Sequence, residues 1–239
     1  MKKSGRHLPP LVSCIMPTFN RPRFLHQAIK NFVNQTYENK ELIIVDDGST
    51  PVSECIPRDS RVTYVNLPGH NSIGHKLNLG IERSNGEIIQ KMDDDDYYHP
   101  SFLSTTVSAL HGNNPKTSIV GFNCFLILIA DTGEVKFSEQ GWCAGGTLCF
   151  FRELWNKTHF QNISGAEDWC FVKDSQAEQI KVNDAELYII VRHGESHAWN
   201  RIGDADVTES FRQRPPYHKR IETLVSAEDL KFYRSFQGK

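Results

Sequence analysis

The sequence predicts an α/β fold in which helices flank a mixed, mainly parallel sheet of Rossmann-like design. Short, nearly continuous apolar runs at Leu11–Met16 and Glu41–Val45 are typical of strands buried on both faces. Between them, apolar residues recur at helical spacing over Pro22–Gln35, and a proline suits the first turn of a helix. Alternating strands and helices of this kind form parallel βαβ units.

The elements that follow fit the same pattern up to about residue 110. We expect further strands and helices, in chain order, at Arg61–Asn66 (strand), Ile73–Arg83 (helix), Glu87–Met92 (strand) and Pro100–Leu110 (helix). Asn71 or Ser72 would cap the second helix. Beyond it we expect one long strand at Ser118–Ala130, a hairpin turn at 131–133 with a strand at Glu134–Phe137, and a capped helix at Ser226–Phe236.

Composition limits the kind of protein this is. The 239 residues, 38% of them hydrophobic, suffice for one large domain, and a formal net charge of −2 argues against binding nucleic acid. The run Leu11–Met16 is too short for a signal peptide, and Ile119–Ala130 is too short to span a membrane. Six scattered cysteines indicate reduced thiols in a cytoplasmic protein, and a Cys143–Cys149 disulfide is not favoured.

Four consecutive aspartates, Asp93–Asp96, follow the strand predicted at Glu87–Met92. Adjacent carboxylates repel one another unless a cation or hydrogen-bond donors lie among them, and oxygen ligands of this kind suit Mg²⁺, Mn²⁺ or Ca²⁺. A solvated acidic turn is the alternative. A calcium loop beginning at Asp93 is excluded, because its sixth and twelfth positions would be Tyr98 and Ser104.

Polar residues follow three of the predicted strands at the point where each strand ends. These are Thr18-Phe19-Asn20, Asp46-Asp47 and the aspartate run. Ligands of open α/β sheets bind beyond the carboxyl ends of the strands, so the three loops should converge. Neither glycine-rich phosphate loop is present, so we expect a phosphorylated ligand to be held through a metal.

Five segments, in this order, resemble the motifs of family 2 glycosyltransferases. They are V-S-C-I-M-P-T-F-N-R, E-L-I-I-V-D-D-G-S, N-S-I-G-H-K-L-N, D-D-D-D-Y-Y-H-P and G-A-E-D-W, and they lie within residues 11–200. The resemblance implies a GT-A fold, a nucleotide-sugar donor and inversion at the anomeric carbon. It also implies a nucleotide-binding half at 11–110 and an acceptor half at 111–203 in a single domain over 1–239, with a helical tail at 204–239.

The resemblance assigns a set of residues to the donor. By similarity, the donor-binding residues are Pro17, Thr18, Phe19, Asn20, Arg21, Asp47, Asn71, Gly74, Lys76, Asp93 and Asp94. Asp47 would accept a hydrogen bond from a uracil N–H, whereas Asp46 is expected to bond its own turn. Lys76 would contact the diphosphate, or is simply a surface lysine.

The resemblance also implies a divalent metal, Mn²⁺ or Mg²⁺. The family's D-x-D motif maps onto Asp93 and Asp95, with Asp95 as the direct ligand, although Asp94-x-Asp96 also fits the pattern. His197 would be a further ligand. His193 is an alternative to it, and a structural role remains open for both histidines.

The catalytic base is assigned to Asp168 in the G-A-E-D-W segment. A carboxylate beside the acceptor hydroxyl would take its proton, and burial by Trp169 and Trp142 would raise its pKa. The alternative is that both acids of the segment only favour a helix N-terminus. By similarity, the acceptor-binding residues are Trp142, Gly145, Gly146, Glu167 and Trp169, although Gly145 and Gly146 also fit a bent core strand.

The sequence therefore predicts a metal-dependent glycosyltransferase that takes a sugar from a nucleoside diphosphate sugar, with UDP favoured, and passes it to a carbohydrate or glycoconjugate. A sugar-phosphate nucleotidyltransferase and a non-catalytic nucleotide-sugar-binding protein are the alternatives. Bacterial surface polysaccharide synthesis, at the cytoplasmic face of the membrane, is an expectation from the family alone. The tail is expected to pack on the core, with peripheral membrane contact or subunit pairing as alternatives, and the oligomeric state stays open.

Overall fold

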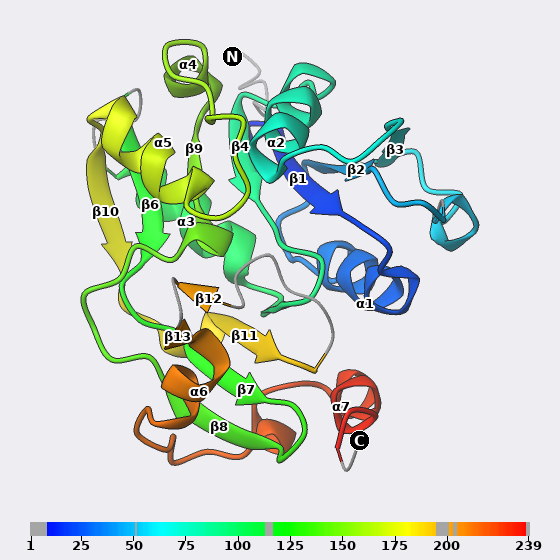
Figure 1. Ribbon diagram of the computed structural model, residues 1–239. Coiled ribbons are helices and arrows are strands. Elements are labelled where there is room, and N and C mark those ends of the chain that lie inside the picture. The colour runs from blue at the N-terminus through cyan, green and yellow to red at the C-terminus, as the bar shows by residue number, and fades with distance from the viewer. Residues whose placement is uncertain (1–8, 51, 113–116, 195–200, 203–204, 238–239) are drawn as a thin grey trace, which may run out of the picture.

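The structure is a computed structural model that describes residues 9–50, 52–112, 117–194, 201–202 and 205–237. Its main sheet has seven strands in the order β10-β6-β9-β4-β1-β2-β3 (Figure 1). In chain order these are β1 (Val12–Thr18), β2 (Lys40–Asp46), β3 (Val62–Asn66), β4 (Ile88–Lys91), β6 (Ser118–Phe122), β9 (Cys149–Phe151) and β10 (Glu178–Val182). Only β9 runs antiparallel to its neighbours in this sheet, so the predicted mainly parallel sheet is confirmed.

Helices cover both faces of this sheet. They are α1 (Pro22–Val33), α2 (Ile73–Glu82), α3 (Phe102–His111), α4 (Arg152–Trp155) and α5 (Glu167–Ser175). Because side chains alternate along a strand, Met16 of β1 packs in the apolar cluster of α1 and α3, and Ile15 packs in that of α2, α4 and α5. The predicted helices begin and end within two residues of these bounds, and Ser72 caps α2 by accepting a hydrogen bond from the His75 N–H.

A second, four-stranded sheet lies beside the first, in the order β5-β11-β7-β8. Its strands are β5 (Tyr97–Tyr98), β7 (Leu126–Ile129), β8 (Glu134–Phe137) and β11 (Tyr188–Arg192). The predicted long strand at Ser118–Ala130 is therefore wrong, because the chain leaves the main sheet after β6 and enters the second sheet at β7. Both halves are buried and apolar, and the sign of the break in the sequence is Asn123, a polar residue directly after β6. The predicted hairpin turn between β7 and β8 is confirmed.

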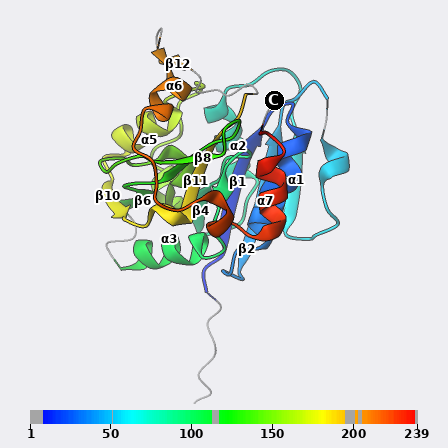
Figure 2. The ribbon, with the colours of Figure 1, turned by 90° about the horizontal axis from the view of Figure 1, so that it is seen from below.

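The C-terminal segment wraps around the second sheet and ends against α1 (Figure 2). It contains β12 (Arg201–Ile202), β13 (Ala205–Asp206), α6 (Val207–Arg212) and α7 (Ala227–Arg234). Ser226 caps α7, as predicted, by accepting a hydrogen bond from the Asp229 N–H. The Asp229 carboxylate in turn bonds Gln27 and pairs with Lys30 of α1, both at 2.8 Å, so the expected packing of the tail on the core is confirmed.

Single-turn 3-10 helices complete the described elements, at Ser53–Cys55, Gly145–Thr147, Ala185–Leu187 and Ile221–Thr223. All six cysteines are free thiols, in agreement with the sequence. Among the described residues, no helix is long and apolar enough to cross a membrane.

Candidate active site

The polar loops after β1, β2 and β4 meet at one edge of the main sheet, as the sequence predicts. Thr18, at the end of β1, donates a hydrogen bond from its hydroxyl to Asp94 Oδ2 at 2.6 Å. Its carbonyl accepts a hydrogen bond of 3.0 Å from Lys76 Nζ on α2, and the same ammonium group reaches Asp47 after β2. The parallel arrangement of these strands brings the loops together, because all three end at the same side of the sheet.

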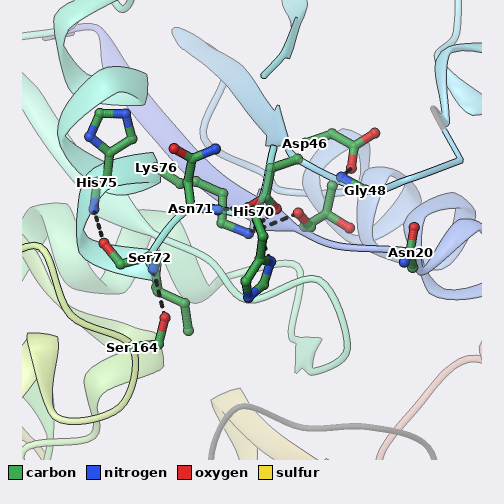
Figure 3. A network of polar contacts seen from close by, with 12 residues as sticks. Asn20, Asp46, Gly48, His70, Asn71, Ser72, His75, Lys76 and Ser164 are labelled. Carbon is green, nitrogen blue, oxygen red and sulfur yellow. Dashed lines mark hydrogen bonds and ion pairs between the residues drawn. The ribbon is translucent and has the colours of Figure 1, made fainter. Parts of the chain in front are cut away.

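A buried ion pair fixes the loop after β2 (Figure 3). Lys76 Nζ lies 2.6 Å from Asp47 Oδ1, and the Asn71 backbone N–H donates to Asp47 Oδ2, also at 2.6 Å. Both side chains are almost wholly buried, so Lys76 is not the surface lysine that the sequence left open. Asp46 bonds the Gly48 N–H, the Val52 N–H and the Tyr64 hydroxyl, which confirms its expected role within the protein.

Aromatic rings lie next to this pair and remain partly exposed. The Phe19 ring meets the His70 ring edge to face, with centroids 4.7 Å apart, and His70 Nδ1 lies 3.6 Å from Asp47 Oδ2. Asn20 adopts a left-handed backbone conformation and accepts hydrogen bonds from Ser49 and Thr50. Phe19 and His70 thus form an open aromatic surface beside a fixed carboxylate.

Gly74 has a structural reason to be glycine. A β-carbon at this position would lie 1.8 Å from the Gln161 carbonyl oxygen, so the first turn of α2 packs directly on the loop at residues 161–164. The Gly74 N–H also donates to the Ile163 carbonyl at 3.0 Å. Gly74 therefore lets the first turn of α2 pack closely on the segment that leads into α5.

The four aspartates divide into two buried and two partly exposed carboxylates. Asp96 is buried and accepts hydrogen bonds from the Tyr188 hydroxyl (2.5 Å) and the Val191 N–H (3.0 Å), and burial raises its pKa well above the ordinary range. Asp94 is buried against Thr18 and Arg21; burial raises its pKa to about 6, although Arg21 opposes the rise. Asp93 and Asp95 keep side-chain exposures of 29% and 11%.

Asp95 lies between two nitrogen-bearing side chains. Arg21 lies 2.6 Å from Asp94 Oδ1 and 2.8 Å from Asp95 Oδ2, and His193 Nε2 lies 3.2 Å from the same Asp95 oxygen. The His193 ring packs on Phe24 at a tilt of 35°, with centroids 4.2 Å apart. His197 lies outside the described residues.

The donor atoms at Asp95 and His193 fit a divalent metal. A carboxylate oxygen and an imidazole nitrogen directed at each other are ligands that Mn²⁺ accepts. In the part of the chain that the structure describes, no group of three or more metal-ligating side chains is preassembled. Sites of the Mg²⁺ type use one or two carboxylates and take other ligands from substrate phosphates, so such a pair is consistent with a site completed by the donor.

A buried lysine, which the sequence analysis missed, links the aspartates to α5. Lys91 Nζ lies 3.0 Å from Asp93 Oδ1 and 3.9 Å from Glu167 Oε1. Burial by itself lowers the pKa of Lys91, but Asp93, Asp168 and Glu167 together raise it above the ordinary value, so the group is an ammonium ion. Burial also raises the pKa of Glu167. The available signal in the sequence was a lysine inside the predicted strand Glu87–Met92, directly before the aspartates.

The glycine pair after β8 separates the proposed base from the aspartates. A β-carbon on Gly145 would lie 1.3 Å from Asp168 Oδ2, and one on Gly146 would lie 2.7 Å from Asp93 Oδ2. The two glycines lie in a 3-10 turn that leads into β9, so they do not form the bent core strand that was the alternative in the sequence analysis. Asp168 and Asp93 therefore approach the same short stretch of backbone from two elements.

One of the two tryptophans expected to bury Asp168 does not do so. Trp169 is 61% exposed and lies under the Lys173 ammonium group, 4.9 Å from it, so it does not bury Asp168. Trp142 is half-buried, donates its indole N–H to the Ser138 carbonyl and packs on Phe125. The expectation that both would enclose Asp168 is wrong for Trp169, because α5 directs this residue away from the apolar core.

These features define a class of protein. A mixed, mainly parallel sheet with an acidic cluster after a central strand, a second sheet and a carboxylate-bearing helix is the GT-A arrangement of nucleotide-sugar-dependent glycosyltransferases. The model of glycosyl transferase family 2 matches residues 13–148. A glycosyltransferase of Haemophilus influenzae, itself uncharacterized, is 38% identical over 215 residues, which cover 84% of this chain and 83% of the relative. The chain belongs to glycosyl transferase family 2.

Solved structures agree with this fold. A mannosyltransferase from Pyrobaculum calidifontis in complex with GDP-Man and Mn²⁺ has a TM-score of 0.61 at 21% identity, over 77% of this chain and 56% of that one. S. aureus TarS 1-349 in complex with UDP-GlcNAc has a TM-score of 0.62 at 16% identity, over 80% of this chain and 61% of that one. The chain thus spans less than two thirds of either solved chain. Family membership favours a glycosyltransferase over a nucleotidyltransferase or a non-catalytic binding protein.

Proposed function

We propose that this glycosyltransferase takes a sugar from a nucleoside diphosphate sugar, with UDP as the favoured nucleotide, and transfers it with inversion to an acceptor hydroxyl. The observation that carries the proposal is the glycine pair Gly145-Gly146, which has Asp93 on one side and Asp168 on the other. A donor held at the aspartates and an acceptor held at α5 would meet over this backbone.

The donor half of the site suits a nucleotide. Phe19 and His70 offer an aromatic surface for the base. The Asp47 carboxylate beside them, bound by Lys76 and by the Asn71 N–H, is the proposed acceptor of an imide N–H from the base. Lys76 holds this carboxylate in place rather than facing the diphosphate. Uracil supplies one such N–H; guanine also has N–H donors, and the solved relatives include both a UDP-sugar and a GDP-sugar complex.

The metal half of the site is proposed at Asp95 and His193, with Asp93 as a further carboxylate. Asp94 and Asp96 are fully engaged in buried protein contacts, which favours the pair Asp93-x-Asp95 over Asp94-x-Asp96. A divalent cation bound there would neutralise negative charge on the diphosphate as it leaves. Arg21, already at Asp94 and Asp95, would add positive charge to the same region.

Asp168 is the proposed base. Its Oδ1 accepts a hydrogen bond from the Trp169 N–H at 2.6 Å, which fixes the side chain. The acceptor hydroxyl would lose its proton to Asp168 while its oxygen bonds to the anomeric carbon. The bond from that carbon to the diphosphate breaks on the opposite face, and the nucleoside diphosphate leaves with the electron pair. Trp169, exposed next to Asp168, would offer an aromatic surface to a carbohydrate acceptor.

A thermal-shift panel tests the donor and the metal together. UDP, GDP, dTDP and CDP are each added with and without Mn²⁺, and a ligand that binds only the folded protein raises the melting temperature. We expect one nucleotide, UDP first, to raise it only when Mn²⁺ is present. No shift with any nucleotide would contradict the donor site, and a shift without metal would contradict metal dependence.

A substitution tests the base. Asp168→Asn should keep the UDP–Mn²⁺ thermal shift and lower the turnover of the donor by about 10²–10⁴, the usual contribution of a general base. Turnover equal to that of the unmodified protein would exclude Asp168 as the base.

The proposal also includes a role in surface polysaccharide or glycoconjugate synthesis at the cytoplasmic membrane face. It further includes a single catalytic domain over 1–239.

A further inference from the structure

Lys91 is a buried cation between the two halves of the site. It is the last residue of β4, its side chain is 6% exposed, and its ammonium nitrogen lies 3.0 and 3.3 Å from the two Asp93 oxygens. The same nitrogen lies 3.9 Å from Glu167, the first residue of α5. Lys91 therefore contacts one residue of the aspartate run and one residue next to Asp168.

Stability alone is a weak reason for a lysine at this position. Removing an ammonium ion from water costs several kcal/mol, and buried ion pairs can often be replaced by apolar side chains without loss of stability. Ile89, two residues before Lys91 and on the same face of β4, is apolar and buried, so an apolar side chain would suit this face of the strand. Unlike an apolar side chain, the ammonium ion attracts both the Asp93 and the Glu167 carboxylate and so fixes their positions relative to each other.

The start of α5 needs such a contact. Ala166 precedes the helix with a φ of +67°, a left-handed conformation that costs a residue with a β-carbon about 1–2 kcal/mol. Among the residues that the structure describes, no side chain caps the helix at this position. The Glu167 side chain is buried and points to Lys91, so the contact between them opposes relaxation of the strained turn.

We propose that Lys91 is a positioning residue for transfer, which ties Asp93 to Glu167 and thereby sets Asp168 relative to the donor. The inference rests on the proposed function, because it takes Asp168 as the base. Lys91 touches neither substrate in this scheme. It acts through the backbone of α5, which carries Glu167 and Asp168 in adjacent positions.

The first test needs no substrate. Lys91→Met is compared with Lys40→Met, since Lys40 is also a buried lysine, but it lies at the opposite end of the sheet and donates to the Gln35 and Tyr37 carbonyls. Hydrogen exchange of the α5 backbone amides should be faster by about tenfold or more in Lys91→Met and unchanged in Lys40→Met. Equal exchange of α5 in the two variants would overturn the proposal.

The second test uses release of nucleoside diphosphate from UDP-GlcNAc and GDP-mannose with Mn²⁺, with water as the acceptor. Lys91→Met should lower kcat about 10- to 100-fold, as expected for a misplaced catalytic group, and change the donor KM by less than about threefold. Lys91→Arg should recover part of the loss, and Lys40→Met should keep the kcat of the unmodified protein.

The double variant separates the two proposals. If Lys91 acts through Asp168, Lys91→Met should add nothing to the loss caused by Asp168→Asn. If the double variant loses the product of the two single-variant losses in kcat, Lys91 does not act through Asp168. If Lys91→Met instead raises the donor KM as much as it lowers kcat/KM, Lys91 serves donor binding. Either result would overturn the role of Lys91 while leaving the base intact. Full activity of Asp168→Asn would instead reject the proposed base, and α5 exchange would still decide whether Lys91 holds the helix.

Discussion

Replacing Lys76 by methionine should destabilise the protein strongly, because it leaves a buried carboxylate without its cation. Lys76 Nζ lies 2.6 Å from Asp47 Oδ1, and the side-chain exposures are 4% and 0%. Methionine matches the length of the lysine stem but carries no charge. After the substitution, the Asn71 N–H is the one hydrogen bond to Asp47 that is left among the described contacts.

The expected loss follows from this burial. Removing one partner of a buried ion pair costs about 3–5 kcal/mol, mostly from the charge left behind. For a chain of this size, each kcal/mol lowers the melting temperature by about 2–4 °C, so Lys76→Met should lower it by about 6–20 °C. Asp47→Asn combined with Lys76→Met removes both charges, so the double variant should be more stable than Lys76→Met.

Urea unfolding followed by tryptophan fluorescence measures these free energies, and a second probe checks that the transition is two-state. Lys157→Met is the matched control, because Lys157 is exposed and its loss should change the free energy of unfolding by less than about 0.5 kcal/mol. A loss below about 1 kcal/mol for Lys76→Met would refute the buried pair.

Three further predictions concern the base, the tail and pH. Gly145→Ala should lower donor turnover about 10- to 100-fold by displacing Asp168, whereas Gly112→Ala, whose new methyl lies 3.7 Å from the nearest atom of the described residues, should not; equal turnover would refute the contact. Phe236→Ala, in the tail, should cost about 3–5 kcal/mol in urea unfolding, and a negligible loss would show that the tail is not packed. Burial acts to raise the pKa of Asp229, but hydrogen bonds, first among them one from α1, lower it overall. Its stabilising effect should therefore be present above about pH 4 and disappear as the pH falls through the lower folded value, so Asp229→Asn should differ from the unmodified protein at pH 7 and converge with it in acid.

The sequence pattern alone predicted those strands, helices and caps that depend mainly on neighbouring residues. The apolar runs of β1 and β2, the helical spacing of α1 and the caps at Ser72 and Ser226 are properties of neighbouring residues, and each prediction was confirmed within a few residues. The convergence of the three polar loops also followed, because parallel strands must end at one edge of a sheet. Family motifs in order were enough to identify the family.

Contacts between side chains that lie far apart in the sequence became known only from the tertiary structure. The four aspartates are chemically identical in the sequence, yet Tyr188 and Arg21 come from remote segments and divide them into buried and open carboxylates. The break between β6 and β7 was marked in the sequence only by Asn123, because a strand buried in either sheet needs the same apolar residues. Lys76 and Lys91 are ordinary lysines until the fold places carboxylates within 4 Å of them, since a charge is fixed in position only by what surrounds it in space.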